Sequence, residues 1–449
     1  MQEIEILKTI TYYGTDKDLL VYFNELCDNL KFLKNKSIFL IRQSITSKNK
    51  TFLTQNEKDA IDYINKGLKE ANINRKNTYI KKHGNTKGFK KLDSSFINYN
   101  ILDAVFKGNN DSLYRNLPVH TAQRVIKKTN ESFKSFFNAM KKYDKNKSKF
   151  NGRPKLPGYI KEVNNIYFSN ISCKAKNNSL IFPGTKLTVD IGKVDNINHV
   201  EVIVNDKEYK ILVTVKEKIS IEQKSNKNYA SIDIGVNNLV ALATNLSKEK
   251  PILIKAKTLK ALNQYYNKKI AKLQSESNKR TRQIRRLQSK RYKQIYNLIH
   301  SIANRIIDYL LRKDISVLII GHNTNWKQEL NLGKVNNQNF VQLPFNMLIN
   351  TLVFKCKVNG IECIVREESY TSKASFLDKD KICKSTFSGT RITRGTYKTK
   401  KGIYINADVN AACNILVKEK SDAFKCKNFN HLLHTKSFND KNLLKCVCL

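Results

Sequence analysis

The chain has 449 residues, enough for two to four domains, and 40% of them are hydrophobic, which predicts folded domains and excludes a disordered chain. Its 82 Lys and Arg against 38 Asp and Glu give a net charge of +44, which indicates a polyanionic partner, and nucleic acid is the one expected. The longest apolar runs, such as residues 317–320, are far shorter than the roughly 20 residues of a membrane-spanning helix.

The nine cysteines are scattered and odd in number, which argues against a secreted disulfide framework. The N-terminus lacks the pattern of a signal peptide, and heavy use of Lys, Asn and Ile is typical of an AT-rich genome. We therefore expect a soluble, cytoplasmic, nucleoid-associated bacterial protein. His431-x-x-His434 and Cys446-x-Cys448 offer a metal cluster, but neither spacing is the usual zinc arrangement.

Helices flanked by strands are predicted for the first half of the chain. Residues 1–14 alternate and predict a strand, and apolar residues at three- and four-residue steps predict helices over 15–145, with a loop at 75–95. The turn-rich segment 151–158 then precedes short strands, which predict a small barrel or sandwich over 146–225. The strands are expected at 165–169, 180–182, 187–191, 200–204 and 210–215.

From residue 226 onward the pattern is typical of an α/β layer. Apolar runs at 229–234 and 239–244, joined by Gly235-Val-Asn-Asn238, predict a β-hairpin. Continuous apolar runs at 315–320 and 361–365 predict two further strands. Helical segments separate these strands, so we expect a partly parallel sheet.

A long helical region is predicted at 258–311, and its charge is one-sided. Between Lys255 and Lys293 it has fourteen Lys or Arg against a single acid, Glu276. A solvated helix normally mixes both signs, so this charge predicts contact with nucleic acid. The residues expected to make that contact are Lys268, Lys269, Lys279, Arg280, Arg282, Arg285 and Arg286.

Two carboxylates are the candidate metal ligands. Asp233 lies in a run suited to burial, where an ionised carboxylate is costly unless it is paired or binds metal; the alternative is an edge Asp that starts the hairpin turn. Gly235 would let another backbone or a phosphate approach. Asp408 is either a helix N-cap or a second ligand, which the small Ala411 and Ala412 would bring close to Asp233. Two-metal cleavage of a phosphodiester needs several acids, so a third is required.

Several motifs resemble those of TnpB, the RNA-guided nucleases of insertion-sequence transposons, which are related to type V CRISPR effectors and Fanzors. Ser231-Ile-Asp-Ile-Gly-Val236 and Asn406-Ala-Asp-Val-Asn-Ala-Ala412 resemble the first and third RuvC motifs of the family. Ser369-Tyr-Thr-Ser-Lys373 is similar to the element that precedes its target-binding insert. Leu117-Pro-Val-His-Thr-Ala-Gln-Arg124 and Gly152-Arg-Pro-Lys-Leu-Pro157 are similar to the end of its recognition region, so the resemblance extends to about residue 417.

The chain departs from the family at the second RuvC motif, which usually ends its strand on a Glu where Gly321 stands here. Some TnpB branches and the Fanzors carry a displaced Glu just before Thr-Ser. The resemblance therefore implies Glu368 as the third ligand, with Glu367 as the alternative. An exposed acidic strand end without a ligand is the remaining interpretation.

A second departure concerns the insert between Thr-Ser and the third motif. Typical relatives bind zinc there through two Cys pairs, but residues 373–405 contain only Cys383, so no zinc is expected. Its content of Lys, Arg and Gly predicts a basic flap that contacts DNA phosphates through Arg391 and Arg394.

The resemblance implies a multidomain α+β protein. An RNase H-like (RuvC) α/β nuclease core is expected beside a helical recognition domain and a small β-barrel (wedge) domain. The expected boundaries are 1–14 for the first wedge strand, 15–145 for recognition, 146–225 for the wedge, 226–370 and 403–417 for the core, 371–402 for the insert and 418–449 for a tail without an assigned role.

The function implied is that of a monomeric, transposon-associated, RNA-guided DNA endonuclease. Asp233, Glu368 and Asp408 would hold two Mg²⁺ ions, with Mn²⁺ as an alternative. A guide RNA from the transposon end would pair with a double-stranded DNA target beside a short flanking motif. Because Gly321 replaces the usual acid, a guide-directed repressor that does not cut is a second hypothesis. A strand-transferring transposase is a third.

Overall fold

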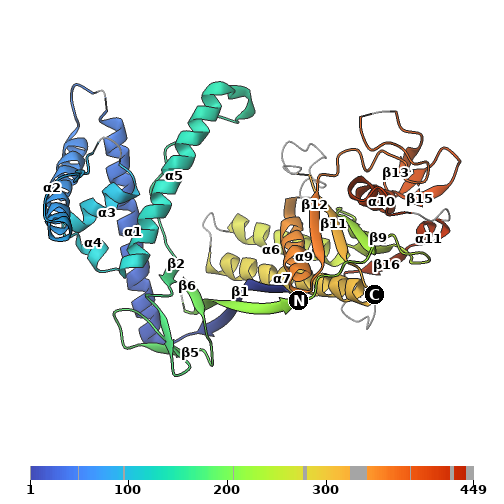
Figure 1. The fold of residues 1–449 in the computed structure, drawn as a ribbon, viewed down its shortest axis with the longest axis horizontal. Coiled ribbons are helices and arrows are strands. Elements are labelled where there is room, and N and C mark those ends of the chain that lie inside the picture. The colour runs from blue at the N-terminus through green and yellow to red at the C-terminus, as the bar shows by residue number, and fades with distance from the viewer. Residues whose placement is uncertain are drawn as a thin grey trace. The chain divides into compact units, whose positions relative to one another are not determined.

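The computed structural model describes residues 2–48, 50–94, 97–205, 207–276, 281–323, 341–384, 386–424 and 429–440. The chain forms two compact units, whose elements are labelled in Figure 1. One unit comprises Glu5–Lys218, and the other comprises Met1–Ile4 with Ile219–Leu449. None of the described helices is long and apolar enough to cross a membrane.

Amphipathic helices pack on β-strands in the unit of residues 5–218. Phe23, from the apolar face of the first helix, lies edge-on against Phe182 and Tyr209, with ring centroids 5.1 Å and 5.3 Å away. These rings belong to one continuous core of helical and strand residues. The helices are α1 (Lys17–Thr46), α2 (Gln55–His83), α3 (Tyr99–Gly108), α4 (Ser112–Arg115), α5 (Val119–Lys145) and the 3₁₀ turn η1 (Lys147–Lys149).

The strands predicted in this region are confirmed, and they form two sheets. One has the order β1-β7-β6-β2 and the other the order β3-β4-β5. Closure of these strands into a barrel stays a prediction. The strands are β1 (Gln2–Gly14), β2 (Asn165–Ser169), β3 (Lys174–Lys176), β4 (Ser179–Ile181), β5 (Thr188–Asp190), β6 (Ile197–Val204) and β7 (Tyr209–Ile221).

The loop predicted at 75–95 is wrong in its first half, because α2 continues to His83. A capping box starts this helix: Thr54 Oγ1 accepts from the Glu57 N–H, and the Glu57 carboxylate accepts from the Thr54 N–H (3.0 Å). The helix ends where Gly84 takes a φ of 73°. Basic side chains in the last turn lie at the negative end of the helix dipole, which stabilises a segment whose Asn and Lys content favoured a loop.

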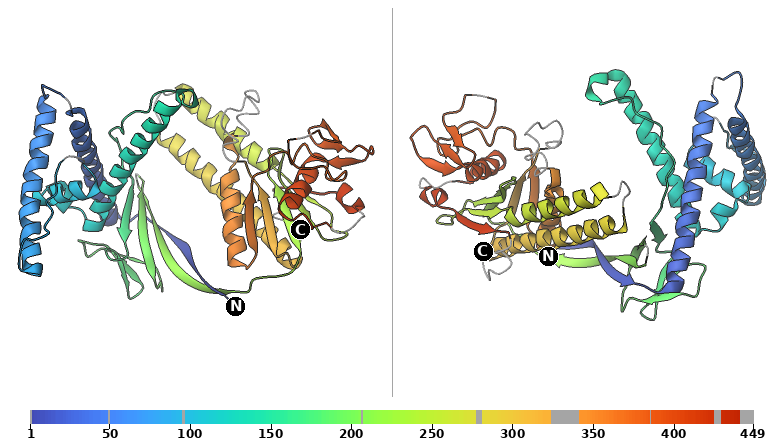
Figure 2. Two further views of the ribbon diagram at one scale, coloured as in Figure 1. Left: turned by 45° about the horizontal axis from the view of Figure 1, so that its top comes forward. Right: turned by 180° about the vertical axis from the view of Figure 1, so that it is seen from behind.

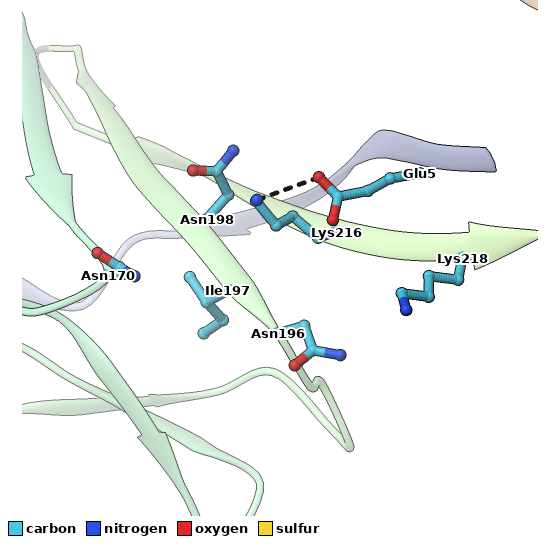
Figure 3. Close-up of a pocket in the computed structure, with 7 residues that line it drawn as sticks. All are labelled: Glu5, Asn170, Asn196, Ile197, Asn198, Lys216 and Lys218. Atoms are coloured by element: carbon cyan, nitrogen blue, oxygen red, sulfur yellow. Dashed lines mark ion pairs between the residues drawn. The ribbon is translucent and has the colours of Figure 1, made fainter.

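A polar hollow of about 370 Å³ opens beside β6 and β7 in the same unit (Figure 3). Lys216 Nζ and Glu5 Oε1 form an ion pair across it at 3.0 Å. Asparagine side chains make up most of the remaining lining, and Glu5 is its only acid. The lining residues are Glu5, Asn170, Asn196, Ile197, Asn198, Lys216 and Lys218.

The second unit is built on a mixed sheet with the strand order β12-β11-β8-β9-β10-β16. β8, β9 and β10 form an antiparallel meander, and β11 and β12 extend it with parallel pairing. The predicted hairpin and both later strands are confirmed. The bounds are β8 (Tyr229–Asp233), β9 (Asn238–Thr244), β10 (Ile252–Lys255), β11 (Val317–Gly321), β12 (Glu362–Arg366) and β16 (Lys436–Asn439).

Helices cover both faces of this sheet (Figure 2). Alternate β8 residues face opposite sides, so Ile232 packs in the core with α7 and α9, whereas Ser231 Oγ donates to the Ala412 carbonyl of α10 at 2.7 Å. The helical region predicted at 258–311 consists of two paired helices, α6 and α7, in which Tyr266 Oη donates to Gln294 Oε1 (2.9 Å). The helices are α6 (Lys257–Glu276), α7 (Arg282–Arg312), α9 (Phe345–Val358) and α10 (Ala407–Glu419).

The insert predicted at 371–402 contributes to a small antiparallel sheet of β13 (Thr390–Thr393), β14 (Thr396–Lys398) and β15 (Tyr404–Asn406). Two carboxylates connect its separate parts. Asp380 accepts from the N–H groups of Ser375 (2.8 Å) and Ser388 (3.1 Å), and Asp378 accepts from that of Lys400 (2.9 Å). These bonds tie the two ends of the insert to its middle.

The tail after residue 418, to which the sequence assigned no role, is partly built into the second unit. It contains α11 (Asn430–Leu433) and β16, which pairs in parallel with β10. Asp440 follows β16, is fully buried, and accepts from the N–H groups of Thr258 and Leu259 at 2.9 Å each. Its carboxylate therefore lies at the positive end of α6, where it satisfies two backbone donors.

Replacing Asp440 with Ala should lower the free energy of unfolding by about 1–2 kcal/mol, because two helix N–H groups lose their acceptor. Urea unfolding followed by circular dichroism measures this loss, and Asp440→Asn should lose less. Asp422→Ala is the control: Asp422 is exposed, so the change should stay within about 0.5 kcal/mol. Equal midpoints for the Asp440 and Asp422 variants would contradict the capping role.

Candidate active site

The acids singled out in the sequence lie at one edge of the mixed sheet. β8 and β11 run in parallel, and Ile320 pairs with Ile232, so Gly321 and Asp233 are the next residues at the same end of the two strands. β12 pairs with β11 in the same direction, and Glu368 follows its last residue, Arg366, after one intervening position. Parallel strands end at the same edge of a sheet, so the two acids lie at the ends of the strands on either side of β11.

Gly321 leaves the space that the Glu368 carboxyl fills. A Cβ at position 321 would lie 2.8 Å from Glu368 Oε2 and 2.4 Å from Ile415 Cδ1, both closer than real contacts allow. The Glu368 carboxyl, which follows the neighbouring strand β12, therefore occupies space that a side chain at position 321 would need. A side chain at 321 and the present position of Glu368 exclude each other.

Asn323 holds Glu368 by two hydrogen bonds. Its Nδ2 donates to Glu368 Oε1 (3.1 Å), and its Oδ1 accepts from the Glu368 N–H (3.2 Å). Oε2 is buried and has no hydrogen-bond partner among the described residues. Burial raises the pKa of Glu368 to about 7, and Lys418 opposes this shift only in part. One carboxylate oxygen is thus fixed, while the other is left for a further ligand.

Glu367, the alternative third acid, is exposed and accepts from Ser369 Oγ at 2.7 Å. Lys418 Nζ donates to the backbone carbonyls of Glu367 (2.9 Å) and Ser369 (3.2 Å), so it clamps the turn on both sides of Glu368. Thr371 closes that turn, because its Oγ1 donates to the Glu368 carbonyl at 2.8 Å. The geometry therefore turns Glu368 toward Gly321 and leaves Glu367 engaged with its neighbour.

The other two acids both influence the ionisation of Asp233. Burial, Glu368 and Asp408 all raise the pKa of its carboxyl well above the usual range, and Arg391 acts in the opposite direction. The carboxyls of Glu368 and Asp408 therefore both lie within electrostatic reach of Asp233. The need for glycine at position 235 is local, because a Cβ there would lie 2.8 Å from the carbonyl oxygen of Asn238 in the same turn.

Asp408 is not the N-cap of α10. That role belongs to Asn406, whose Oδ1 accepts from the N–H groups of Asp408 (3.1 Å) and Val409 (3.2 Å). The carboxyl of Asp408 is instead bound by Asn238 Nδ2 (2.8 Å) and Arg391 Nη2 (3.3 Å). The interpretation of Asp408 as a cap is therefore wrong, and its carboxylate faces the hairpin that follows Asp233.

Arg391 lies at this site and is the cation that contacts Asp408. Its Nη2 also donates to the Arg394 carbonyl, which fixes the guanidinium within the insert. The sequence predicted only phosphate contacts for Arg391. It gave no sign of the positioning roles of Asn238, Asn323 and Lys418, because a single Asn or Lys outside a motif carries no chemical signal of its own.

The donor set fits Mg²⁺ in kind, since carboxylate oxygens are the ligands that this ion prefers. The partnerless Glu368 Oε2 and the mutual repulsion at Asp233 are features that a bound cation would relieve. As the side chains stand, no group of three or more His, Cys, Asp or Glu among the described residues is close enough to hold a metal ion. Asp408 in particular is engaged by Arg391.

The basic residues predicted to contact nucleic acid occupy exposed positions where the structure describes them. Lys268 and Lys269 lie on α6, and the three arginines lie in the first turns of α7. Lys279 and Arg280 lie outside the described residues, as do Cys446 and Cys448 of the alternative metal cluster. The exposed arginines of the set are Arg282, Arg285, Arg286, Arg391 and Arg394.

Replacing Gly321 with Ala should lower the free energy of unfolding by about 1–3 kcal/mol, because the added methyl group overlaps Ile415 and Glu368. Thermal unfolding of the metal-free protein measures this change. Gly395→Ala is the matched control, since nothing lies within 4 Å of a Cβ there. If the Gly321 variant unfolds like the Gly395 variant, Glu368 does not fill the space described.

Comparisons with known proteins find two family matches. Residues 209–327 match OrfB_IS605, described as a probable transposase, and residues 345–415 match the Cas12f1-like TNB domain. The first includes Asp233, and the second includes Glu368 and Asp408. No curated protein matches the chain.

Solved structures with similarity to the chain are Cas12 effectors. A cryo-EM structure of a Cas12f1–sgRNA–target DNA complex is 16% identical, with 91% of this chain and 98% of that one covered and a TM-score of 0.32. The mini-RNA-guided endonuclease CRISPR-Cas_phi3 is 11% identical (97% and 94% covered, TM-score 0.35). Alicyclobacillus acidoterrestris C2c1 with single-guide RNA is 9% identical (89% and 70% covered, TM-score 0.33). The similarity to known proteins therefore rests on the two family matches: the chain is similar to TnpB-like proteins, with a segment that matches OrfB_IS605 followed by one that matches the Cas12f1-like TNB domain.

Proposed function

We propose that the chain is an RNA-guided, Mg²⁺-dependent DNA endonuclease with an RNase H-like (RuvC) core. The observation that carries this proposal is the Glu368 carboxyl, which fills the space at Gly321, at the same strand end as Asp233. The meander β10-β9-β8, extended by the parallel strands β11 and β12, is the sheet expected for such a core. The match to a probable transposase family over 209–327 supports the same class.

Asp233, Glu368 and Asp408 are the proposed metal ligands. Bound Mg²⁺ ions would activate a water molecule and stabilise the leaving oxygen of the phosphodiester. Asp233 has two neighbouring acids and therefore gains most from a cation. Glu368 offers Oε2 while Asn323 fixes Oε1, and Asp408 must release Arg391 before it can bind. Arg391 would then be available for a phosphate oxygen of the substrate.

Guide RNA and a double-stranded DNA target are the proposed partners. The net charge of +44 and the exposed basic residues of α6 and α7 provide the contacts with phosphates that such partners need. Base pairing with the guide would read the target sequence, while the protein reads backbone shape and a short flanking motif. The insert at 371–402 is the proposed basic flap over the DNA.

Cleavage is favoured over the repressor hypothesis by the geometry at residue 321. The reason to consider a protein that does not cut was the missing acid at Gly321. The Glu368 carboxyl, held by Asn323, fills the space there, so two further acids lie within electrostatic reach of Asp233. No observation in the structure favours strand transfer.

Glu368→Gln and Asp233→Asn should each reduce Mg²⁺-dependent cleavage of target plasmid by the guide-loaded protein more than about 100-fold. Loss of a residue that only supports a metal ligand typically lowers activity about 10–100-fold, so loss of a ligand itself should lower it further. Glu367→Gln is the matched control and should cleave like the unaltered protein. Full activity of Glu368→Gln with loss in Glu367→Gln would reverse the assignment of the third ligand. Absence of cleavage by the unaltered protein, loaded with its own RNA, would favour the repressor.

Asn323→Ala should weaken Mn²⁺ binding to the guide-free protein about tenfold, because Glu368 loses the donor to Oε1 and the acceptor for its N–H. Isothermal titration calorimetry measures this without any cleavage step. Asn297→Ala, at an exposed position of α7, should bind Mn²⁺ like the unaltered protein. Equal Mn²⁺ affinity of both variants would remove Asn323 from the site.

A further inference from the structure

The segment at the end of α2 carries an unbalanced charge. From residue 71 to residue 91 there are seven Lys or Arg and no Asp or Glu. Attraction to the helix dipole accounts for the cations in the last turn of α2, but not for Arg75, one to two turns earlier, or for Lys87 and Lys90, beyond the end of the helix. Neither Lys82 nor Lys90 has an acidic partner within the described part of the chain.

The residues after α2 fold back along the helix instead of leaving it. Asn72 exchanges two hydrogen bonds with the backbone of Leu92, both 2.9 Å long. Tyr79 Oη donates to the Lys87 carbonyl (2.8 Å), and the guanidinium of Arg75 donates to the Lys90 carbonyl (3.3 Å). A groove of about 620 Å³ results between helix and returning chain, and we call it the α2 groove. Its principal lining residues are Arg75, Tyr79, Lys82, His83, Phe89 and Lys90.

Aromatic rings form the floor of the α2 groove, and cations form its rim. Tyr79 lies between His83 and Phe89, with ring centroids 4.4 Å and 5.8 Å away. The guanidinium of Arg75 stands 5.7 Å from the centre of the Phe89 ring. Tyr79 and Phe89 are half-buried, whereas Arg75, Lys82 and His83 are exposed. His83 and Arg75 are thus exposed planar groups packed on the half-buried rings, close to exposed lysines.

We infer that the α2 groove binds a single-stranded segment of nucleic acid, with an unpaired base stacked on its aromatic and guanidinium planes and adjacent phosphates bound by its lysines. Stacking on aromatic rings combined with a cationic track is how proteins hold single strands without reading their sequence. A duplex keeps its base faces stacked on one another, so it could use the lysines but not the rings. The inference rests on the proposed function only for the source of the single strand, which is either the guide RNA or a displaced DNA strand.

Fluorescence anisotropy with a labelled 12-nucleotide strand, as RNA and as DNA, and with a duplex, tests this inference on the full-length, RNA-free protein. His83→Ala should weaken single-strand binding at least about fivefold and leave duplex binding unchanged. His120→Ala, an exposed histidine of α5, is the control for loss of a ring.

Charge is tested separately from stacking. The double variant Lys82→Ala/Lys90→Ala should reduce the slope of log Kobs against log salt by about 1.4, or about 0.7 for each phosphate contact with a single strand. Lys174→Ala/Lys176→Ala, on the exposed strand β3, removes the same charge elsewhere in this unit and should leave the slope unchanged. Equal slopes for the two double variants would overturn the inference, as would equal losses of single-strand and duplex binding in His83→Ala.

The arms of the experiment also identify the source of the strand. A larger loss for RNA assigns the α2 groove to the guide, and a larger loss for DNA assigns it to a displaced strand. Neither measurement requires metal or cleavage. An inactive nuclease that binds as expected would therefore contradict the proposed function alone, whereas an active nuclease with unchanged binding in every variant would contradict this inference alone.

Discussion

The absence of a side chain at Gly321 is the constraint on which the candidate site depends. Where β11 ends, a single Cβ would meet both Ile415 of α10 and the carboxyl of Glu368. Close packing of α10 on the sheet and the position of Glu368 therefore need the same empty space. Asn323, immediately beyond β11, and Lys418, on α10, then hold the turn that carries Glu368. Core packing and acid placement are thus linked through one residue.

Two of the carboxyls at this edge of the sheet have unusual pKa values. Burial raises the pKa of both Asp233 and Glu368, and at Asp233 the neighbouring carboxyls of Glu368 and Asp408 raise it further. Arg391 opposes the rise in the pKa of Asp233, and together with Asn238 it binds the carboxylate of Asp408. A carboxyl whose burial and neighbours both oppose its ionisation is electrostatically unfavourable in the protein as it stands. Such stored repulsion is common where carboxylates serve chemistry and not structure.

The other acids of this basic chain illustrate the structural use of a carboxylate. Asp440 binds the backbone N–H groups at the start of α6, and Asp378 and Asp380 tie together the parts of the insert. In each case backbone donors bind the carboxylate, and at the fully buried Asp440 they offset the cost of its burial. Glu368 differs, because one of its oxygens is buried without such a donor in the described residues. That difference separates a candidate ligand from a structural acid more clearly than exposure does.

Much of the fold followed from local patterns. Alternation and apolar runs located most strands of both units, though not β3 or the strands of the insert, and the hairpin of β8 and β9 was recognised from its turn residues. The continuation of α2 to His83 was missed, because a capping box and tertiary packing outweighed a composition typical of loops. Two strands of the six-stranded sheet, β10 and β16, were missed, because four residues are too few to carry a signal until neighbouring strands provide their partners.

By itself the sequence determined the chemistry available at the site: two acids in recognisable motifs, two adjacent candidates for a third, and a surplus of cations for a polyanion. Only the tertiary structure decided which of the adjacent glutamates turns toward Gly321, and that Arg391 contacts Asp408. The reason is physical. Residue type and local period are written in the chain, but the direction of a side chain at a strand end is set by partners such as Asn323 and Lys418, which come from other elements.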